Sequence, residues 1–280
     1  MVGAGLESRK QIYGVDFSGA KDAGRKVWIA KGEIIDKHLY IDKCSRITEF
    51  IGVNKELDAT LNGLTELISS QTDAIFGLDF PFSVPGALMK TDTNWSDFVK
   101  RFPGMFPTAE VFKDKCIIAS DGWELKRCTE NESSAPMSAY NLRLYKQTYH
   151  GICRVLFSLV DNEAAVILPM GLPMPGKPWV VEVCPRSTIK TRFRSYGLVD
   201  YKQTGETQKH ERFQLIDWIK AQKVTISEDL IDKIIADGQG DAIDSVIAAV
   251  AVWLNFDILV KVTDKLREQE PYCREGYIFV

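Results

Sequence analysis

Three strand-like apolar segments of the chain each carry a carboxylate at a place where a hydrophobic side chain is expected. These carboxylates are Asp16 in the segment 12–16, Asp79 in the segment 74–79 and Glu182 in the segment 179–183. A charge in such a setting is costly unless it is paired, hydrogen-bonded or bound to a metal. Any fold of this chain must therefore bring these strands to a place where the charges find partners.

A fourth acidic position opens a very hydrophobic helix predicted over 241–254. A helix that is apolar on nearly all sides is buried. Asp241 and Asp244 lie three residues apart in its first turn, on one face, where the helix macrodipole favours negative charge. Ala248 continues that face and is expected to leave room beside the carboxylates. Acidic positions spread so widely along the chain predict one site assembled from distant segments.

The hydrophobic patterns of the first 80 residues predict an α/β fold. Three strands are expected over 11–17, 26–30 and 39–41, followed by an amphipathic helix over 56–70 and a strand over 74–79. A meander, a crossover helix and a further strand together predict a mixed sheet.

We expect one domain, residues 1–280, with an insertion over 86–164 that is mostly helical. Pro81 and Pro85 end the preceding strand, because proline donates no ladder hydrogen bond. The insertion holds a polar stretch over 120–138 and a predicted long helix over 142–159. After it come a strand over 179–184, helices over 206–221 and 227–236, the helix over 241–254 and a docked terminal segment, 275–280.

Each acidic residue also has a purely structural explanation. Asp241 can be an N-cap or first-turn residue. Asp16 and Asp79 can be Asx-turn residues at strand ends. Glu182 can be half of a buried ion pair with an arginine such as Arg186. The combination is harder to explain in this way, because the same segments contain few basic residues to pair with.

Oxygen ligands from carboxylates are what hard divalent cations such as Mg²⁺ prefer. Two such ions can stabilise both the attacking and the leaving oxygen of an in-line displacement. Without a metal, clustered carboxylates repel and raise one another's pKa values. The pattern therefore predicts a metal-dependent phosphoryl-transfer centre with Mg²⁺ or Mn²⁺ as its cofactor.

Several short motifs resemble one known group of proteins. These motifs are Gly14-Val15-Asp16, Leu78-Asp79-Phe80-Pro81, Val181-Glu182-Val183-Cys184-Pro185, Gly240-Asp241-Ala242-Ile243-Asp244-Ser245 and Glu275-Gly276-Tyr277. The acidic positions resemble the RNase H-like superfamily, particularly its RuvC-type resolvase branch. The whole set, over residues 11–280, resembles the family called domain of unknown function 429, whose members are predicted RNase H-like nucleases.

This resemblance implies a five-stranded mixed sheet with helices on both faces. It also implies metal-binding roles for Asp16, Asp79 and Asp241 or Asp244, with Glu182 near them. In the nuclease hypothesis that we favour, Asp16 bridges two metal ions and Glu182 binds metal or orients water. The implied activity is hydrolysis of phosphodiester bonds in nucleic acid. The chain departs from the resolvase branch at Asp79, where that branch carries a glutamate.

Basic residues near these motifs are candidate phosphate contacts. Arg186, Lys190 and Arg194 follow Glu182 at four-residue intervals and share one face if the segment is helical. Lys21 follows Asp16 by five residues. A solvated helix face is a simpler explanation of the three spaced residues.

The charge balance sets limits on these expectations. The net charge is −3, which gives no support to tight non-specific binding of nucleic acid, so that partner rests on the resemblance. An actin-like or sugar-kinase-like ATPase is an alternative, although such proteins need a second copy of the fold. A catalytically degenerate RNase H-like binding module is another.

The cellular setting is expected to be cytoplasmic, without a membrane partner. Six cysteines occur without Cys-x-x-Cys pairs, as is usual in a reducing compartment. By inspection, no apolar run approaches the ~20 residues that a membrane helix needs.

Overall fold

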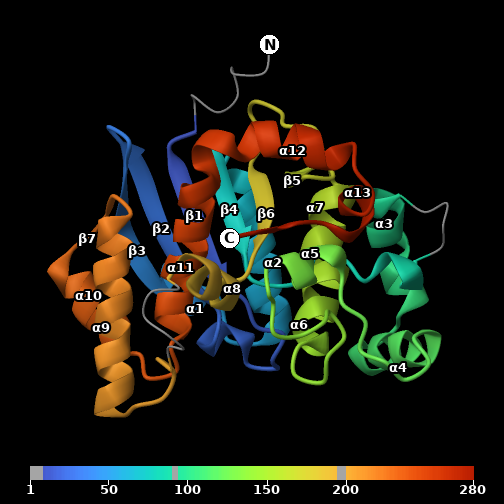
Figure 1. Ribbon diagram of the computed structural model, residues 1–280, viewed down its shortest axis with the longest axis horizontal. Helices are drawn as coiled ribbons and strands as arrows, with labels where there is room; N and C mark the ends of the chain where they lie inside the picture. The colour runs from blue at the N-terminus through green and yellow to red at the C-terminus, as the bar shows by residue number, and fades with distance from the viewer. Residues whose placement is uncertain (1–8, 90–93, 194–199) are drawn as a thin grey trace.

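β1 lies inside a mixed sheet whose strand order is β5-β6-β4-β1-β2-β3-β7, and β8 pairs with β6 (Figure 1). The computed structural model describes residues 9–89, 94–193 and 200–280. The strands of this sheet are β1 Gln11–Asp16, β2 Trp28–Ile35, β3 His38–Arg46, β4 Ala74–Leu78, β5 Val166–Leu168, β6 Trp179–Val183, β7 Val224–Ile226 and β8 Ile278–Phe279.

The strand directions confirm the predicted mixed sheet. β1, β2 and β3 form an antiparallel meander, whereas β4 runs parallel to β1 and β6 runs parallel to β4. This five-strand arrangement is the one implied by the resemblance to RNase H-like proteins. The expected number of strands was wrong, because β5, β7 and β8 extend the sheet. Each is only two or three residues long, too short for a hydrophobic period to be visible.

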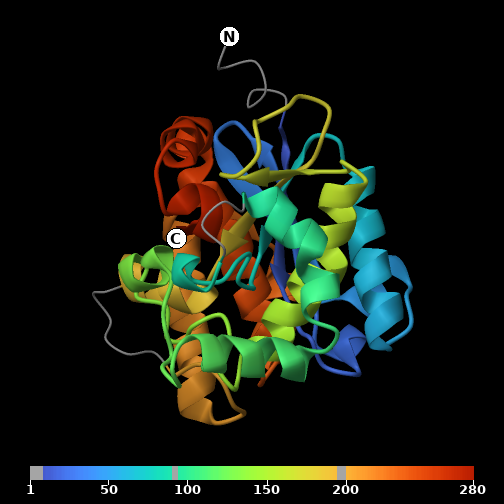
Figure 2. The ribbon, with the colours of Figure 1, turned by 90° about the vertical axis from the view of Figure 1, so that its right-hand side faces the viewer.

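Helices cover both faces of the sheet, as expected (Figures 1 and 2). The helices are α1 Ile47–Ile51, α2 Leu57–Ser70, α3 Trp95–Met105, α4 Ala109–Ala119, α5 Cys128–Glu132, α6 Tyr145–His150, α7 Phe157–Asp161, α8 Pro185–Arg192, α9 Glu206–Ala221, α10 Glu228–Ala236, α11 Asp241–Asn255, α12 Leu259–Arg267 and α13 Tyr272–Glu275. Short 3₁₀ segments are η1 Ala23–Arg25, η2 Gly86–Leu88 and η5 Phe256–Ile258, and η3 Gly151–Leu156 is a π-helix.

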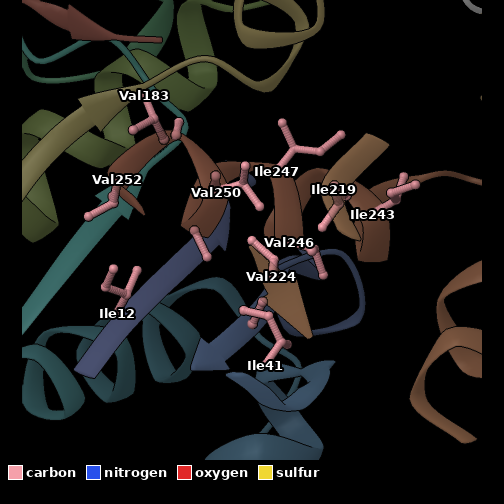
Figure 3. Packing of buried hydrophobic residues seen from close by; sticks show 14 of the residues in the cluster. Ile12, Ile41, Val183, Ile219, Val224, Ile243, Val246, Ile247, Val250 and Val252 are labelled. Carbon is pink, nitrogen blue, oxygen red and sulfur yellow. The ribbon is translucent and has the colours of Figure 1, made fainter. Parts of the chain in front are cut away.

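Two buried apolar clusters occupy the two faces. One joins α11 to the sheet and to α9 and α10, and Figure 3 shows its valine and isoleucine side chains between α11 and the strands. The other joins α2, α3, α4 and the π-helix to the opposite face. The helices of the 86–164 segment therefore share the core of the sheet. The predicted long helix over 142–159 is divided, because η3 separates α6 from α7.

Glycines in the sheet bring α11 unusually close to it. Gly14 of β1 and Gly77 of β4 are register neighbours. A Cβ atom at Gly14 would lie 2.1 Å from the Ser245 carbonyl oxygen, and one at Gly77 would lie 2.9 Å from that of Ala248. Only glycine permits such an approach. Ala248, expected to leave room beside the carboxylates, instead packs against these glycines, and the contact places the first turn of α11 beside β1 and β4.

One expectation about apolar length was wrong. The helical stretch Asp241–Arg267, 27 residues, is long and apolar enough to cross a membrane by length and composition alone. In the structure, 72% of its apolar window is buried inside the protein. Core helices pass the same test, and the most buried part of the stretch is α11, whose side chains belong to the core of the sheet.

Candidate metal-dependent active site

Asp16 and Asp79 meet because they end neighbouring parallel strands. Val15 pairs with Leu78, and the Asp79 amide donates to the Val15 carbonyl at 3.1 Å. The two aspartates therefore lie side by side at the carboxyl edge of the sheet, where ligands bind in open α/β folds. Together with Asp241 and Asp244 they line one cavity of about 580 Å³. The structure thus brings together the four aspartates predicted as metal ligands, which we call the aspartate cluster.

A larger cavity, about 840 Å³, lies elsewhere and is lined by Trp95, Met170, Leu172 and their neighbours. None of the predicted site residues that the structure describes lines it. The size of a cavity therefore does not identify the site. The four aspartates in the smaller cavity identify it.

The start of α11 leaves Asp241 available to the cavity. Gly240 is the N-cap residue and adopts φ +79°, in the left-handed region that favours glycine. The Asp237 side chain accepts from the Ala242 amide at 2.9 Å and satisfies one of the helix's free N–H groups. Asp237 therefore bonds a free N–H group of the first turn, and Asp241 is not the N-cap but lies in the first turn, as the other half of its structural explanation expected.

The cluster disfavours its own ionisation. Burial raises the pKa of Asp16 well above its usual range, and the nearby carboxylates of Asp244 and then Asp241 add to the effect. Burial and then Asp244 raise the pKa of Asp79 to about 8. Burial also raises the pKa of Asp241, to about 6, against the opposing influence of Lys202. The cavity is therefore a place that stabilises added positive charge.

Asp244 is held by two residues that the sequence patterns did not indicate. The Lys202 ammonium lies 2.6 Å from Asp244 Oδ2, and the Tyr201 hydroxyl donates to Oδ1 at 2.6 Å. Burial and then Asp244 raise the pKa of Tyr201, so its hydroxyl stays protonated and can donate. Both residues lie in a loop before α9, where no periodicity or motif marks them.

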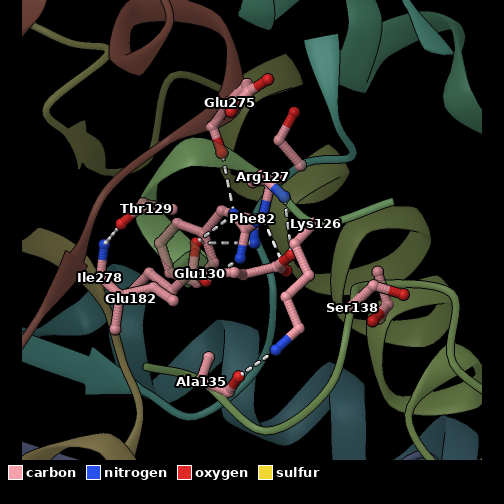
Figure 4. Close-up of polar contacts among 12 residues, drawn as sticks. Phe82, Lys126, Arg127, Thr129, Glu130, Ala135, Ser138, Glu182, Glu275 and Ile278 are labelled. Carbon is pink, nitrogen blue, oxygen red and sulfur yellow. Dashed lines mark hydrogen bonds and ion pairs between the residues drawn. The ribbon is translucent and has the colours of Figure 1, made fainter. Parts of the chain in front are cut away.

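Glu182 has a different setting, shown in Figure 4. Its Oε1 accepts from Arg127 Nη2 at 2.5 Å, and its Oε2 accepts from Arg127 Nη1 at 2.8 Å and from the Phe82 amide at 2.9 Å. Arg127 also bonds Glu130 Oε1 at 2.9 Å and the Glu275 carbonyl at 2.8 Å. We call these residues the Arg127 network.

This geometry gives Glu182 a structural partner. Arg127 and Glu182 are almost fully buried, and both carboxylate oxygens of Glu182 are engaged within the protein. The ion-pair explanation holds, with Arg127 as the partner in place of Arg186. Both oxygens of Glu182 accept hydrogen bonds within the protein, and through Arg127 the side chain joins β6 to the N-terminus of α5 and to α13, while it also lines the cavity.

The predicted phosphate contacts are only partly brought to the cavity. Arg186 lines it, whereas Lys21 and Lys190 are exposed and lie outside its lining. Arg194 lies outside the described residues. The segment is helical, so Arg186 and Lys190 share one face of α8 as expected, but of these two residues Arg186 alone lines the cavity. Lys26 and Arg143, which no pattern indicated, line the cavity beside Arg186.

The donor types of the cluster fit a divalent cation, since Mg²⁺ and Mn²⁺ prefer carboxylate oxygens. The four carboxylates do not, however, form a complete metal-binding site as they stand. Within residues 9–89, 94–193 and 200–280, no three His, Cys, Asp or Glu side chains converge closely enough to hold a metal ion.

Comparisons with known proteins assign this chain no family and no activity. The sequence matches no protein-family model and no curated protein. Among solved structures, the chain is similar to the crystal structure of the yeast mitochondrial Holliday junction resolvase Ydc2. That match has 11% sequence identity and a TM-score of 0.34, and it covers 91% of this chain and 81% of the resolvase. At this level it assigns no residue and no activity. The mixed α/β fold with its central sheet is established by the strand order itself.

Proposed function

We propose that this protein is a metal-dependent nuclease of the RNase H-like type, related to the family called domain of unknown function 429. One observation carries the proposal: Asp16, Asp79, Asp241 and Asp244 converge on one cavity from three distant parts of the chain. Buried carboxylates that raise one another's pKa are costly, and perturbed groups of this kind are concentrated at functional sites.

In this proposal the aspartate cluster holds Mg²⁺ or Mn²⁺. A bound divalent cation supplies a Lewis acid that stabilises charge developing on a phosphodiester. Asp16 is central because Asp79, Asp241 and Asp244 all influence its carboxylate. Glu182 is not assigned a catalytic role, since Arg127 and the Phe82 amide occupy its oxygens.

Nucleic acid is the proposed substrate, and the cavity rim supports this choice. Lys26 and Arg143 are exposed and line the same cavity as the aspartates, with Arg186 half-buried beside them. Cations at the edge of an acidic site can contact the phosphates that flank the reacting one. A local arrangement of this kind is compatible with a net charge of −3.

The alternatives are less well supported by the arrangement of strands. An actin-like or sugar-kinase-like ATPase needs two copies of the fold, whereas the described residues form a single sheet. A degenerate binding module needs no cluster of costly carboxylates, and its distinguishing property is binding of nucleic acid without hydrolysis.

The test is hydrolysis of single-stranded, double-stranded and branched nucleic acids with Mg²⁺ or Mn²⁺. Asp16→Asn is expected to lower the rate by about a thousandfold, as for loss of a central catalytic group. The matched control is Asp232→Asn, which changes an exposed aspartate of α10 in the same way. Hydrolysis that survives Asp16→Asn would contradict the proposed mechanism. Binding without hydrolysis in the unmodified protein would favour the binding module.

A further inference from the structure

The carboxylate of Asp244 is already satisfied inside the protein. Lys202 Nζ lies 2.6 Å from one oxygen, and the Tyr201 hydroxyl donates to the other at 2.6 Å. Asp244 is only 3% exposed, whereas the Lys202 side chain is about half exposed. The lysine therefore reaches a buried carboxylate from the surface.

The backbone around Lys202 is firmly anchored. The Arg212 guanidinium donates through Nη1 to the Tyr201 carbonyl at 2.5 Å and to the Gln203 carbonyl at 2.9 Å. Gln203 in turn donates from its amide to the Gly238 carbonyl at 2.6 Å. These contacts fix the chain on both sides of Lys202, so its ammonium can leave Asp244 by side-chain rotation alone.

Lys202 also faces the rest of the aspartate cluster. Its charge favours the ionised forms of Asp16, Asp79 and Asp241, besides pairing with Asp244. In position and in charge it does for these carboxylates what a bound cation would do. An ammonium carries one positive charge and contacts carboxylates by hydrogen bonds, whereas a divalent cation carries two charges and coordinates several carboxylate oxygens, so it interacts more strongly with several carboxylates at once.

We propose that Lys202 is a tethered counter-ion that competes with the divalent cation for Asp244. This inference rests on the proposed function, because it assumes that the aspartate cluster binds the metal. Divalent cation and ammonium exclude one another at Asp244 Oδ2. Tyr201 keeps its hydrogen bond to Oδ1 in both states and holds the carboxylate in place. Lys202 thus stabilises the metal-free protein and weakens metal binding.

The experiment is a titration with Mn²⁺ alone, without nucleic acid, followed by calorimetry and by melting temperature. Lys202→Met removes the charge and keeps most of the apolar stem. Its Kd for Mn²⁺ is expected to fall about tenfold, which corresponds to about 1.4 kcal/mol. Its melting temperature without metal is expected to fall, and Mn²⁺ is expected to raise it more than in the unmodified protein.

Two control variants separate charge from other effects. Lys202→Arg keeps the positive charge and should bind Mn²⁺ much as the unmodified protein does. Lys209→Met makes the same change on the exposed surface of α9 and should alter neither property. Lys202→Gln serves as a second neutral variant if Lys202→Met does not fold, as judged by circular dichroism.

The outcomes distinguish this inference from the proposed function. Tighter Mn²⁺ binding by the neutral variants alone supports the tethered counter-ion. An unchanged or higher Kd in them, with clear binding by the unmodified protein, overturns the inference and leaves the metal site intact. No Mn²⁺ binding by any variant overturns the inference together with the proposed metal site.

Discussion

The aspartate cluster and the Arg127 network are both groups of buried carboxylates, but their charges are compensated differently. In the network, Glu182 has a bidentate partner in Arg127 and a further donor in the Phe82 amide. In the cluster, Lys202 pairs with Asp244, and within the described residues this is the one ion pair that any of the four aspartates makes. In the network each carboxylate oxygen of Glu182 and Glu130 accepts a hydrogen bond from Arg127 or from a backbone amide, whereas the described residues place one ammonium among the four aspartates.

This difference distinguishes buried carboxylates that stabilise the fold from buried carboxylates that are available to a ligand. An engaged carboxylate ties distant segments together, and breaking its pair is strongly destabilising. A carboxylate that lacks a matched partner has a raised pKa and gains from an added cation. In the apolar strands, Asp79 and Glu182 carry the same sequence signature, yet they belong to opposite classes.

The largest expected effect is a loss of stability when the Arg127 network is disrupted. Arg127→Met leaves Glu182 and Glu130 buried without their cation and is expected to lower the free energy of unfolding by about 3–5 kcal/mol. Urea denaturation measures this loss. Lys126→Met, at the neighbouring lysine that bonds only the Ala135 carbonyl, is the matched control and should cost much less. Equal costs for the two variants would contradict the structural role of the network.

Replacing an aspartate of the cluster is expected to have a smaller effect on stability, and of opposite sign: the metal-free protein becomes more stable. The pKa of Asp79 is raised from an ordinary value of 3.8 to about 8, so the folded protein holds this proton between those values while the unfolded chain loses it. Metal-free stability therefore falls as pH rises from about 4 to about 8. Asp79→Asn removes this fall and is expected to stabilise the metal-free protein by about 1 kcal/mol at pH 7.5, and less at pH 4.5.

Urea denaturation of both proteins across this pH range, with a chelator present, measures the difference. Asp232→Asn again serves as the control, because that aspartate is exposed. An Asp79→Asn variant that is less stable than the unmodified protein at pH 7.5 would show that the carboxylate is compensated after all.

The smallest expected effect is a change in melting temperature on adding Mn²⁺, and it distinguishes the aspartate cluster from the Arg127 network directly. Mn²⁺ is expected to raise the melting temperature by about 3 °C, because a ligand of the folded state alone stabilises it. Asp16→Asn should lose this rise, whereas Glu182→Gln should melt earlier but keep it. A rise that Glu182→Gln abolishes and Asp16→Asn retains would exchange the roles assigned to the two groups.

Much of the fold could be predicted from hydrophobic period. The strands ending at Asp16 and Asp79, the helix over 56–70 and the helix that Asp241 opens all lie close to their predicted positions. Long periodic segments are the easiest to predict, since many residues repeat the same signal. The strands β5, β7 and β8 were missed because their pairing depends on neighbours far along the chain.

The partners of the carboxylates could not be predicted. Arg127 lies 55 residues before Glu182, in a polar stretch, and Lys202 lies 42 residues before Asp244, in a loop. Ion pairs over such separations leave no local pattern in the sequence. The Arg186–Lys190–Arg194 spacing predicted a cationic ridge beside the site, but of the two members that the structure describes Arg186 alone lines the cavity.

The sequence by itself determined where the acidic residues stand: at the ends of apolar strands and in the first turn of an apolar helix. Strand alternation and helical period place such residues at the edges of a sheet without knowledge of any partner. The tertiary structure decided which of them are neutralised. Gly14 and Gly77 let α11 approach the sheet and crowd four aspartates together, while Arg127 reaches Glu182 and removes it from that group. Compensation of charge depends on distances through space, and these exist only once the chain has folded.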